Sequence, residues 1–249
     1  MELKVHACGR IERALDRFQE AHFWIHQMEM NYHTSDPFRW NLNAFLKSIK
    51  EVPLLLKAAL QNDKNWIDWY RPRADELRTD PLISTLSMKR DLVVHRDMLV
   101  PKSTGSVGTT ELRGMKIYMG VPINPFDDSE IAMKRYLDVA KTTGDVLGIL
   151  SRDEDSIPCV FRAWQLPEFE KELVLLCSEA WLRIGQDLTK TLEWLGEQVP
   201  PYDLDCRHRN KGYQFMLFDR EELINGFDLK SNEKEAKKGA KIPRFQQES

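Results

Sequence analysis

Apolar side chains recur at spacings of three and four residues through most of the first hundred positions, and this periodicity restricts that part of the chain to helices. One apolar stripe runs over residues 11–28, a second over residues 38–60, and a third begins at Leu82. Such spacing gives each helix one face that must be buried against its neighbours. We therefore predict an antiparallel helical bundle over residues 1–100.

Two Asp-Pro pairs indicate where helices of this bundle begin. Asp36-Pro37 and Asp80-Pro81 each combine a capping carboxylate with a proline at the first helical position, where no backbone N–H is required. A third proline, Pro53, falls inside the second stripe and is expected to bend that helix. The sequence thus predicts one helix from about residue 37 and another that ends near His95.

The pattern changes after residue 100. Residues 101–110 are rich in Ser, Thr and Gly and are predicted to form a loop, and a mixed α and β region follows over residues 111–229. Residues 230–249 are rich in Lys and poor in apolar side chains, which predicts a flexible tail. Within the mixed region the expected strands cover 115–121, 159–165 and 213–217, and the expected helices cover 129–150 and 167–198. The predicted fold class is mainly α, a helical bundle followed by a smaller α+β region.

Charge and cysteine content exclude several classes of protein. The formal net charge of the 249 residues is −3, so any nucleic-acid contact must come from a local basic patch. The four cysteines are far apart in the sequence and form no C-x-x-C pair, which argues against a zinc site. Since no stretch approaches 18 apolar residues and no apolar leader is evident, we expect a cytoplasmic protein without a membrane segment, metal or cofactor.

The segment Arg90-Asp91-Leu92-Val93-Val94-His95 carries the strongest functional signal. It places a permanent cation, a carboxylate and a titratable imidazole within six residues at the end of a predicted helix. Phosphodiester cleavage requires a fixed positive group and a proton-transfer group near neutral pH, and Arg90 with His95 would supply both. The alternative interpretation is a charged helix end, where basic side chains interact with the helix dipole.

Other candidate sites have competing structural interpretations. Arg17 and His22 repeat the arginine–histidine spacing, but His22 lies on an apolar stripe, where a hydrogen-bonded core histidine is the usual explanation. His22 and His26, with Glu29 nearby, have the spacing of metal ligands on one helix face. Residues 207–211 form a basic cluster that could contact a nucleic-acid backbone or remain exposed loop charge.

Residues 1–100 resemble the HEPN superfamily of helical-bundle proteins, many of which are ribonucleases in toxin–antitoxin and phage-defence systems. The likeness depends on Arg90, on Asp91 in the polar position after it, and on His95 near the helix end. The helix over 40–60 and the helix that begins at Asp80-Pro81 add to it. The remainder of the chain matches no family that we can name.

This resemblance implies a metal-independent endoribonuclease that acts as a homodimer, with both motifs lining one cleft for RNA. Two copies of His95 would serve as general base and general acid, Arg90 would bind the phosphate, and Asp91 would orient its neighbours. Lys89 and Arg96 would add positive charge for the RNA phosphates. Such a protein would be a toxin or defence effector, with a cognate antitoxin as a further partner.

Two other functions are compatible with the residues alone. In the first, the chain is a non-catalytic helical interaction or scaffold protein, in which Arg90 and His95 are structural and complete an interface. In the second, the mixed region senses a small molecule or nucleotide. The first alternative predicts that His95→Ala lowers thermal stability, and the ribonuclease hypothesis predicts that it abolishes RNA cleavage.

Overall fold

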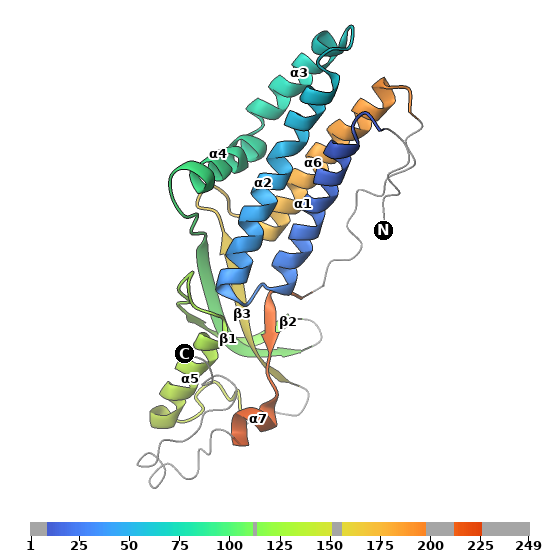
Figure 1. Ribbon diagram of the computed structural model, residues 1–249. Helices are drawn as coiled ribbons and strands as arrows, with labels where there is room; N and C mark the ends of the chain where they lie inside the picture. Colours follow the sequence, from blue (N-terminus) through green and yellow to red (C-terminus); the bar gives the residue numbers. More distant parts are fainter. Residues whose placement is uncertain (1–8, 112–113, 151–155, 198–211, 226–249) are drawn as a thin grey trace. The chain divides into compact units, whose positions relative to one another are not determined.

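The computed structural model describes residues 9–111, 114–150, 156–197 and 212–225, in which it has seven helices and four strands. The predicted fold class, mainly α with a smaller α+β region, is confirmed. In chain order the elements are α1 (Glu12–Met30), α2 (Ser35–Leu60), α3 (Trp66–Thr79), α4 (Pro81–His95), β1 (Lys102–Glu111), β2 (Gly114–Val121), α5 (Glu130–Thr143), β3 (Ile157–Gln165), α6 (Leu173–Trp194), β4 (Phe215–Leu217) and α7 (Arg220–Asn225) (Figure 1).

The chain divides into two compact units, and both of them are assembled from separated segments. Unit 1 takes its described residues from 1–31, 36–100 and 169–211, and unit 2 takes its own from 32–35, 101–168 and 212–249. Unit 1 therefore contains α6 as well as α1 to α4. The boundary predicted at residue 100 was placed where the sequence pattern changes from helical to mixed. It separates α6 from α1 to α4, whereas the contacts of α6 place it with those helices in unit 1.

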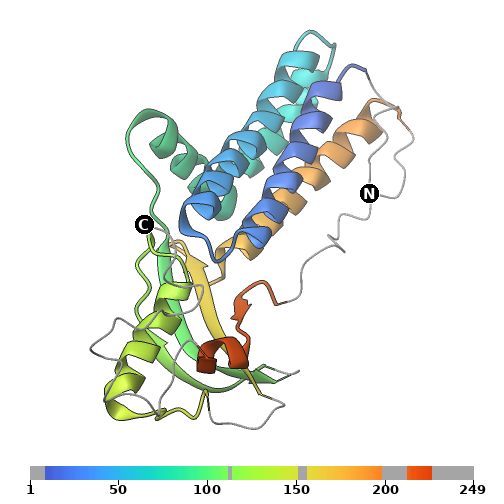
Figure 2. The ribbon, with the colours of Figure 1, turned by 60° about the horizontal axis from the view of Figure 1, so that its bottom comes forward.

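Helix α6 completes the helical unit because it lies along α1 and covers the apolar stripe of that helix (Figures 1 and 2). Phe18 of α1 stacks on Trp181 of α6 with 4.6 Å between ring centroids, and the indole N–H of Trp181 donates to the carbonyl of Phe18. Helix α3 packs on the other end of α6, where the ring centroids of Trp66 and Trp194 lie 5.2 Å apart. The buried apolar side chains of α1 and α2 include Phe18, Ala21, Ile25, Met28, Phe38, Leu42, Phe45, Val52 and Leu56.

Unit 2 is built on an antiparallel sheet in the order β2-β1-β3-β4. Helix α5 packs against β1 and β3 and covers one face of the sheet. Because side chains alternate along a strand, one set of strand residues faces α5 and forms the core of this unit. That core contains Val107, Val121, Ile123, Met133, Tyr136, Leu137, Ile149, Val160 and Leu223.

Strand β1 (Lys102–Glu111) occupies most of the segment 101–110, for which a loop was predicted. Both glycines of the segment have a packing role: a Cβ at Gly105 would lie 2.1 Å from a side-chain carbon of Ile123, and a Cβ at Gly108 would lie 1.9 Å from the carbonyl oxygen of Ile117. Glycine inside a strand often marks such a close approach. The glycines that indicated a loop are thus required where β1 is covered by its neighbours.

Two predicted helices have different limits in the structure. Helix α5 ends at Thr143, short of the predicted residue 150, because Gly144 follows with φ of +80°, a conformation that ends helices. Helix α6 begins at Leu173, since the Glu172 carboxylate accepts hydrogen bonds from the N–H groups of Val174 and Leu175. The predicted strands over 115–121, 159–165 and 213–217 correspond to β2, β3 and β4. The Lys-rich tail and the basic cluster over 207–211 lie outside the described residues.

Candidate functional site

The candidate site lies on α4, whose two ends are held in different ways. At its start Asp80 is the N-cap, since its Oδ1 accepts hydrogen bonds from the N–H groups of Leu82 at 2.9 Å and Ile83 at 3.0 Å. Pro81 occupies the first helical position, where a missing N–H has no consequence. The helix start predicted from Asp80-Pro81 is confirmed.

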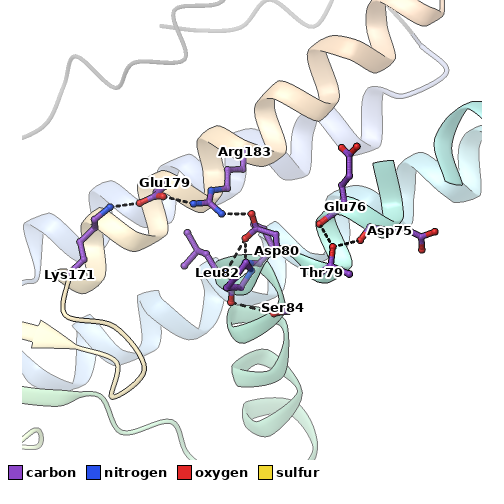
Figure 3. A network of polar contacts seen from close by, with 11 residues as sticks. Asp75, Glu76, Thr79, Asp80, Leu82, Ser84, Lys171, Glu179 and Arg183 are labelled. Atoms are coloured by element: carbon purple, nitrogen blue, oxygen red, sulfur yellow. Dashed lines mark hydrogen bonds and ion pairs between the residues drawn. The ribbon is translucent and has the colours of Figure 1, made fainter. Parts of the chain in front are cut away.

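The cap of α4 is also tied to α6 by a chain of alternating charges. The second carboxylate oxygen of Asp80 pairs with Arg183, which also contacts Glu179, and Glu179 in turn pairs with Lys171 (Figure 3). The ammonium of Lys171, together with Arg183, holds the pKa of Glu179 below its usual range. Figure 3 shows α4 crossing α6 at this contact instead of running alongside it. The first turn of α4 is therefore fixed by both a cap and an ion-pair network.

The last turns of α4 carry the predicted motif, and its carboxylate is already paired. Asp91 accepts a hydrogen bond from Nζ of Lys50, on α2, at 2.5 Å and another from Nη1 of Arg90 at 3.2 Å. These contacts, that of Lys50 above all, lower the pKa of Asp91. The carboxylate thus stays ionised near neutral pH and joins α4 to α2. Among the described residues its hydrogen bonds come from Lys50 and Arg90 and not from His95.

Arg90 and His95 project from different sides of α4. Each residue turns an α-helix by about 100°, so five residues separate these side chains by about 140°. Arg90 is partly buried, with its Nε enclosed and unpaired, whereas His95 is exposed and makes no polar contact with another described residue. The structure therefore brings Arg90 and Asp91 together and leaves His95 apart from Arg90 within one chain.

The two residues predicted to bind RNA phosphates differ in exposure. Lys89 is partly buried on α4, and Arg96 is exposed one residue beyond the helix. Both lie within two residues of an aspartate, Asp91 or Asp97. Positive charge is present here without forming an uninterrupted basic surface.

Large apolar side chains surround the motif and are exposed, which the sequence did not predict. Only the first half of α4 is well covered, through Leu82, Thr85 and Leu86. Beyond Leu86 several apolar side chains are exposed, 63% of Met88, 39% of Val94 and 52% of Met98, whereas residues 89–93 are partly buried and Leu99 is buried. We call this segment the α4 end; it consists of Met88, Leu92, Val94, Met98 and Val100, of which Leu92 is partly buried. Met88 and Leu92 lie one turn apart on the same side of α4, and Val94 is turned from Met88 by about 120°.

The histidines weighed as metal ligands have other contacts. His22 stacks on the Trp181 ring at 4.5 Å between centroids, and Nδ1 of His26 lies 3.0 Å from a carboxylate oxygen of Glu29. In the parts of the chain that the structure describes, no group of three or more His, Cys, Asp or Glu side chains is arranged to hold a metal ion. These two histidines are packing and hydrogen-bonding residues of the helical unit.

Unit 2 contains a buried polar cluster, centred on Arg162 of β3, that sequence reasoning missed. The Arg162 side chain is fully buried, and its guanidinium lies 3.7 Å from the centroid of the Trp164 ring. It donates to the hydroxyls of Ser103 and Ser129 and to the carbonyls of Asn124 and Asp127. Burial lowers the pKa of Arg162 to about 10, so the group remains a cation near neutral pH.

His33 adjoins this Arg162 cluster through Ser129. Its Nδ1 lies 2.8 Å from the Ser129 hydroxyl, and the Ser129 N–H donates to the His33 carbonyl. Burial, with Arg162 as a further cause, lowers the pKa of His33 to about 4. The only sequence signal was the position of Arg162 on the side of β3 that alternation assigns to the core. Its acceptors come from two distant segments, Ser103 of β1 and residues 124–129, which a linear reading does not connect.

Comparison with known proteins gives one finding. A family described as Bacteriophage lambda protein ea47 matches residues 7–107, which is less than half of the chain. No curated protein matches the chain, and no solved structure matches it either. The similarity covers α1 to α4 and therefore includes the predicted motif.

The resemblance to the HEPN superfamily is wrong. The family found over the same helices is that of protein ea47, and nothing supports HEPN. The pattern that suggested it was short: in a chain of this composition an arginine followed by a histidine at this spacing arises about once by chance. The catalytic roles that the resemblance implied for Arg90, Asp91 and His95 lose that support. Separately, among the described helices none combines the length and apolar character needed to cross a membrane.

Proposed function

We propose that this protein is a non-catalytic interaction module that binds another protein through the α4 end. The observation that carries the proposal is the exposure of large apolar side chains along the last turns of α4, beside a carboxylate that is already paired. Exposed apolar groups that gather in one place mark interaction sites more often than those that occur singly. The bound partner is a segment with an apolar face flanked by acidic residues.

The contacts of the motif support a structural role for its charged residues. Asp91 bridges Lys50 and Arg90, so it holds α4 against α2 and is not available as an orienting group for His95. Arg90 is partly buried and directed away from His95 by the helical turn. These residues would keep α4 in position while the apolar side chains on its outer surface make the contact.

Charge at the border of the α4 end determines the chemistry of the partner. Lys50 and Arg90 share the carboxylate of Asp91, and the exposed Arg96 lies beside Asp97 just beyond α4, so basic side chains outnumber acidic ones at this border. An interface becomes specific when charges at its border are complementary. An amphipathic partner helix with aspartate or glutamate beside its apolar face would satisfy both the apolar side chains and the excess of cations.

The test is photo-crosslinking from a defined position. A benzophenone amino acid at Met88, in cells that naturally make the protein, should crosslink to one segment, whose sequence mass spectrometry reads directly. We expect an apolar segment with flanking acids, and we expect Leu92→Lys, one turn from Met88 on the same side of α4, to remove the crosslink. The same amino acid at Met30, an exposed position on α1, is the matched control. Equal products from both positions, or a captured segment without acidic residues, would contradict the proposal.

RNA cleavage separates this proposal from the ribonuclease hypothesis, which stays a prediction. Purified protein is incubated with varied RNAs and a chelator, and wild type is compared with His95→Ala. The interaction module requires no cleavage by either protein. Cleavage that His95→Ala abolishes, with an unchanged melting temperature, would overturn the non-catalytic proposal and restore roles for RNA and an antitoxin as partners.

A further inference from the structure

A small cavity lies inside the helical unit, where side chains of α2, α4 and α6 meet. Its volume is about 70 Å³, and its described lining belongs entirely to unit 1. Helix α4 crosses α6 instead of running along it (Figure 3), and the short side chains of Pro53, Ser87 and Ala180 do not fill the space beside the crossing. Since protein interiors contain few voids larger than a water molecule, a cavity of this size invites an occupant.

The wall of this cavity is almost wholly aliphatic. Leu46 and Ala180, which are 1% and 0% exposed, lie at its base, and Ile49, Leu86 and Ile184 add to its sides. Apolar cavities exclude water and take up apolar groups, and an engineered cavity of about 150 Å³ binds benzene. A space of less than half that volume therefore suits a branched aliphatic group better than an aromatic ring.

The polar side chains of the described lining are Lys50 of α2 and Ser87 of α4, and both are partly exposed, at the mouth of the cavity. The ammonium of Lys50 donates a hydrogen bond to Asp91 at 2.5 Å. An ammonium carries three N–H groups, so this contact leaves others that a ligand can use. The Ser87 hydroxyl is a further possible donor. Hydrogen-bond donors thus border an apolar space.

The charges near the mouth favour an anion. Asp91 is shared by two cations, Lys50 and Arg90, so one carboxylate here faces two positive side chains. The Nε of Arg90 is in addition buried without a hydrogen-bond partner. A ligand carboxylate would compensate the remaining positive charge, whereas a ligand ammonium would be repelled by Lys50.

We propose that this cavity is a binding site for a small aliphatic carboxylate. The branched chain of the ligand fills the apolar space between α2, α4 and α6, and its carboxylate accepts hydrogen bonds from Lys50 and Ser87. The site is distinct from the α4 end, because consecutive residues of a helix project about 100° apart, so Met88 does not share the direction of Ser87. Ligand binding and partner binding are therefore separate properties of the helical unit.

The probe is isovalerate, an isobutyl group that carries one carboxylate. For a ligand of this size we expect a dissociation constant of about 1 mM with the full chain at neutral pH, measured by ligand-observed NMR. Isoamyl alcohol has the same carbon skeleton without the charge. It should bind about tenfold more weakly, because a hydrogen bond to a carboxylate is stronger than one to a neutral oxygen. Acetate, which lacks the branched chain, should show no binding at these concentrations.

Two variants separate the two parts of the site. Lys50→Met removes the ammonium and keeps the length of the side chain, so isovalerate should bind as weakly as isoamyl alcohol, whose own affinity should not change. Ala180→Leu fills the base of the cavity and should abolish the binding of both ligands. Lys47→Met, the same change at an exposed position of α2, is the matched control and should bind isovalerate as wild type does.

Circular dichroism establishes that each variant is folded, and Ser87→Leu, which fills the cavity from its partly exposed mouth, replaces Ala180→Leu if that variant is overpacked. Wild type that fails to bind isovalerate at about 10 mM would overturn the proposal. Equal affinities of wild type for the acid and the alcohol, or unchanged binding by a folded cavity-filling variant, would overturn it as well. The crosslink from Met88 should persist in the cavity-filling variant, so the failure of one proposal is distinguishable from the failure of the other.

Discussion

Arg90 and Arg162 are the same residue type in opposite surroundings, and the contrast shows what a linear motif leaves out. Arg90 belongs to a conspicuous pattern on unit 1, yet it forms an ion pair with the adjacent Asp91 at a partly exposed position. Arg162 belongs to no pattern, yet it is fully buried in unit 2 and connects four other residues. Arg90, which the sequence motif singles out, thus makes fewer contacts than Arg162, which no motif singles out.

The largest effect should follow from removing the buried guanidinium. Arg162→Leu leaves the carbonyls of Asn124 and Asp127 and two hydroxyls without their donor, and each unsatisfied buried group costs about 1–3 kcal/mol, so the free energy of unfolding should fall by about 3 kcal/mol or more. Arg90→Leu is the matched control, with an expected loss below about 1 kcal/mol. Urea denaturation followed by circular dichroism measures both, and equal losses would remove the contrast between the two arginines.

Acid should destabilise unit 2 through His33. Its pKa is about 4 in the fold and 6.5 in the unfolded chain, so the unfolded state binds more protons between these values. The free energy of unfolding should therefore decrease as the pH falls from about 6.5 to 4, by at most about 3 kcal/mol. His33→Asn keeps a polar group near Ser129 and removes the titration. If wild type and this variant lose the same stability over that range, His33 is not the group responsible.

Asp80, the N-cap of α4, and Asp91, in its last turns, should also differ in how much stability is lost when each is removed. Asp80→Ala removes both the N-cap and the Arg183 contact, and loss of a cap costs about 0.5–2 kcal/mol. Asp91→Ala removes a partly exposed ion pair, which is worth about 0.2–1 kcal/mol. Asp80→Asn retains a capping oxygen and should fall between them. Melting temperatures of the three variants give the order, and a larger effect at Asp91 would reverse the description of α4.

The smallest effect on stability is expected at the α4 end. Met88→Gln changes an exposed side chain and should alter the free energy of unfolding by less than about 0.5 kcal/mol. In the crosslinking experiment Leu92→Lys should nonetheless abolish the product. A marked loss of stability in Met88→Gln would mean that this side chain belongs to the fold, and it would weaken the case for an interaction surface.

Local signals in the sequence were sufficient for much of the helical unit. The Asp80-Pro81 pair predicted the start of α4, and the apolar stripes predicted α1 and α2, because caps and periodicity act within a few residues. The prediction was wrong where long-range packing decides. Residues 101–110 were predicted as a loop from their glycines, whereas those glycines admit Ile117 and Ile123 against β1.

The candidate site was only partly predictable. The sequence located Arg90, Asp91 and His95 on the last turns of α4, but it did not show that Asp91 pairs with Lys50 of α2. Met88 and Met98 are exposed because no neighbouring helix covers them, and the local sequence around them does not show where other helices will pack. The HEPN assignment was wrong because a short pattern was given more meaning than its chance frequency allowed.

The segmented make-up of the helical unit has a consequence for biosynthesis. The apolar face of α1 packs on α6, which lies more than a hundred residues later in the chain. Until α6 has been synthesised, Phe18 and its apolar neighbours on α1 lack the helix that buries them in the folded protein. A nascent chain stopped near residue 107 would expose this surface, so we expect such a fragment to recruit chaperones or aggregate.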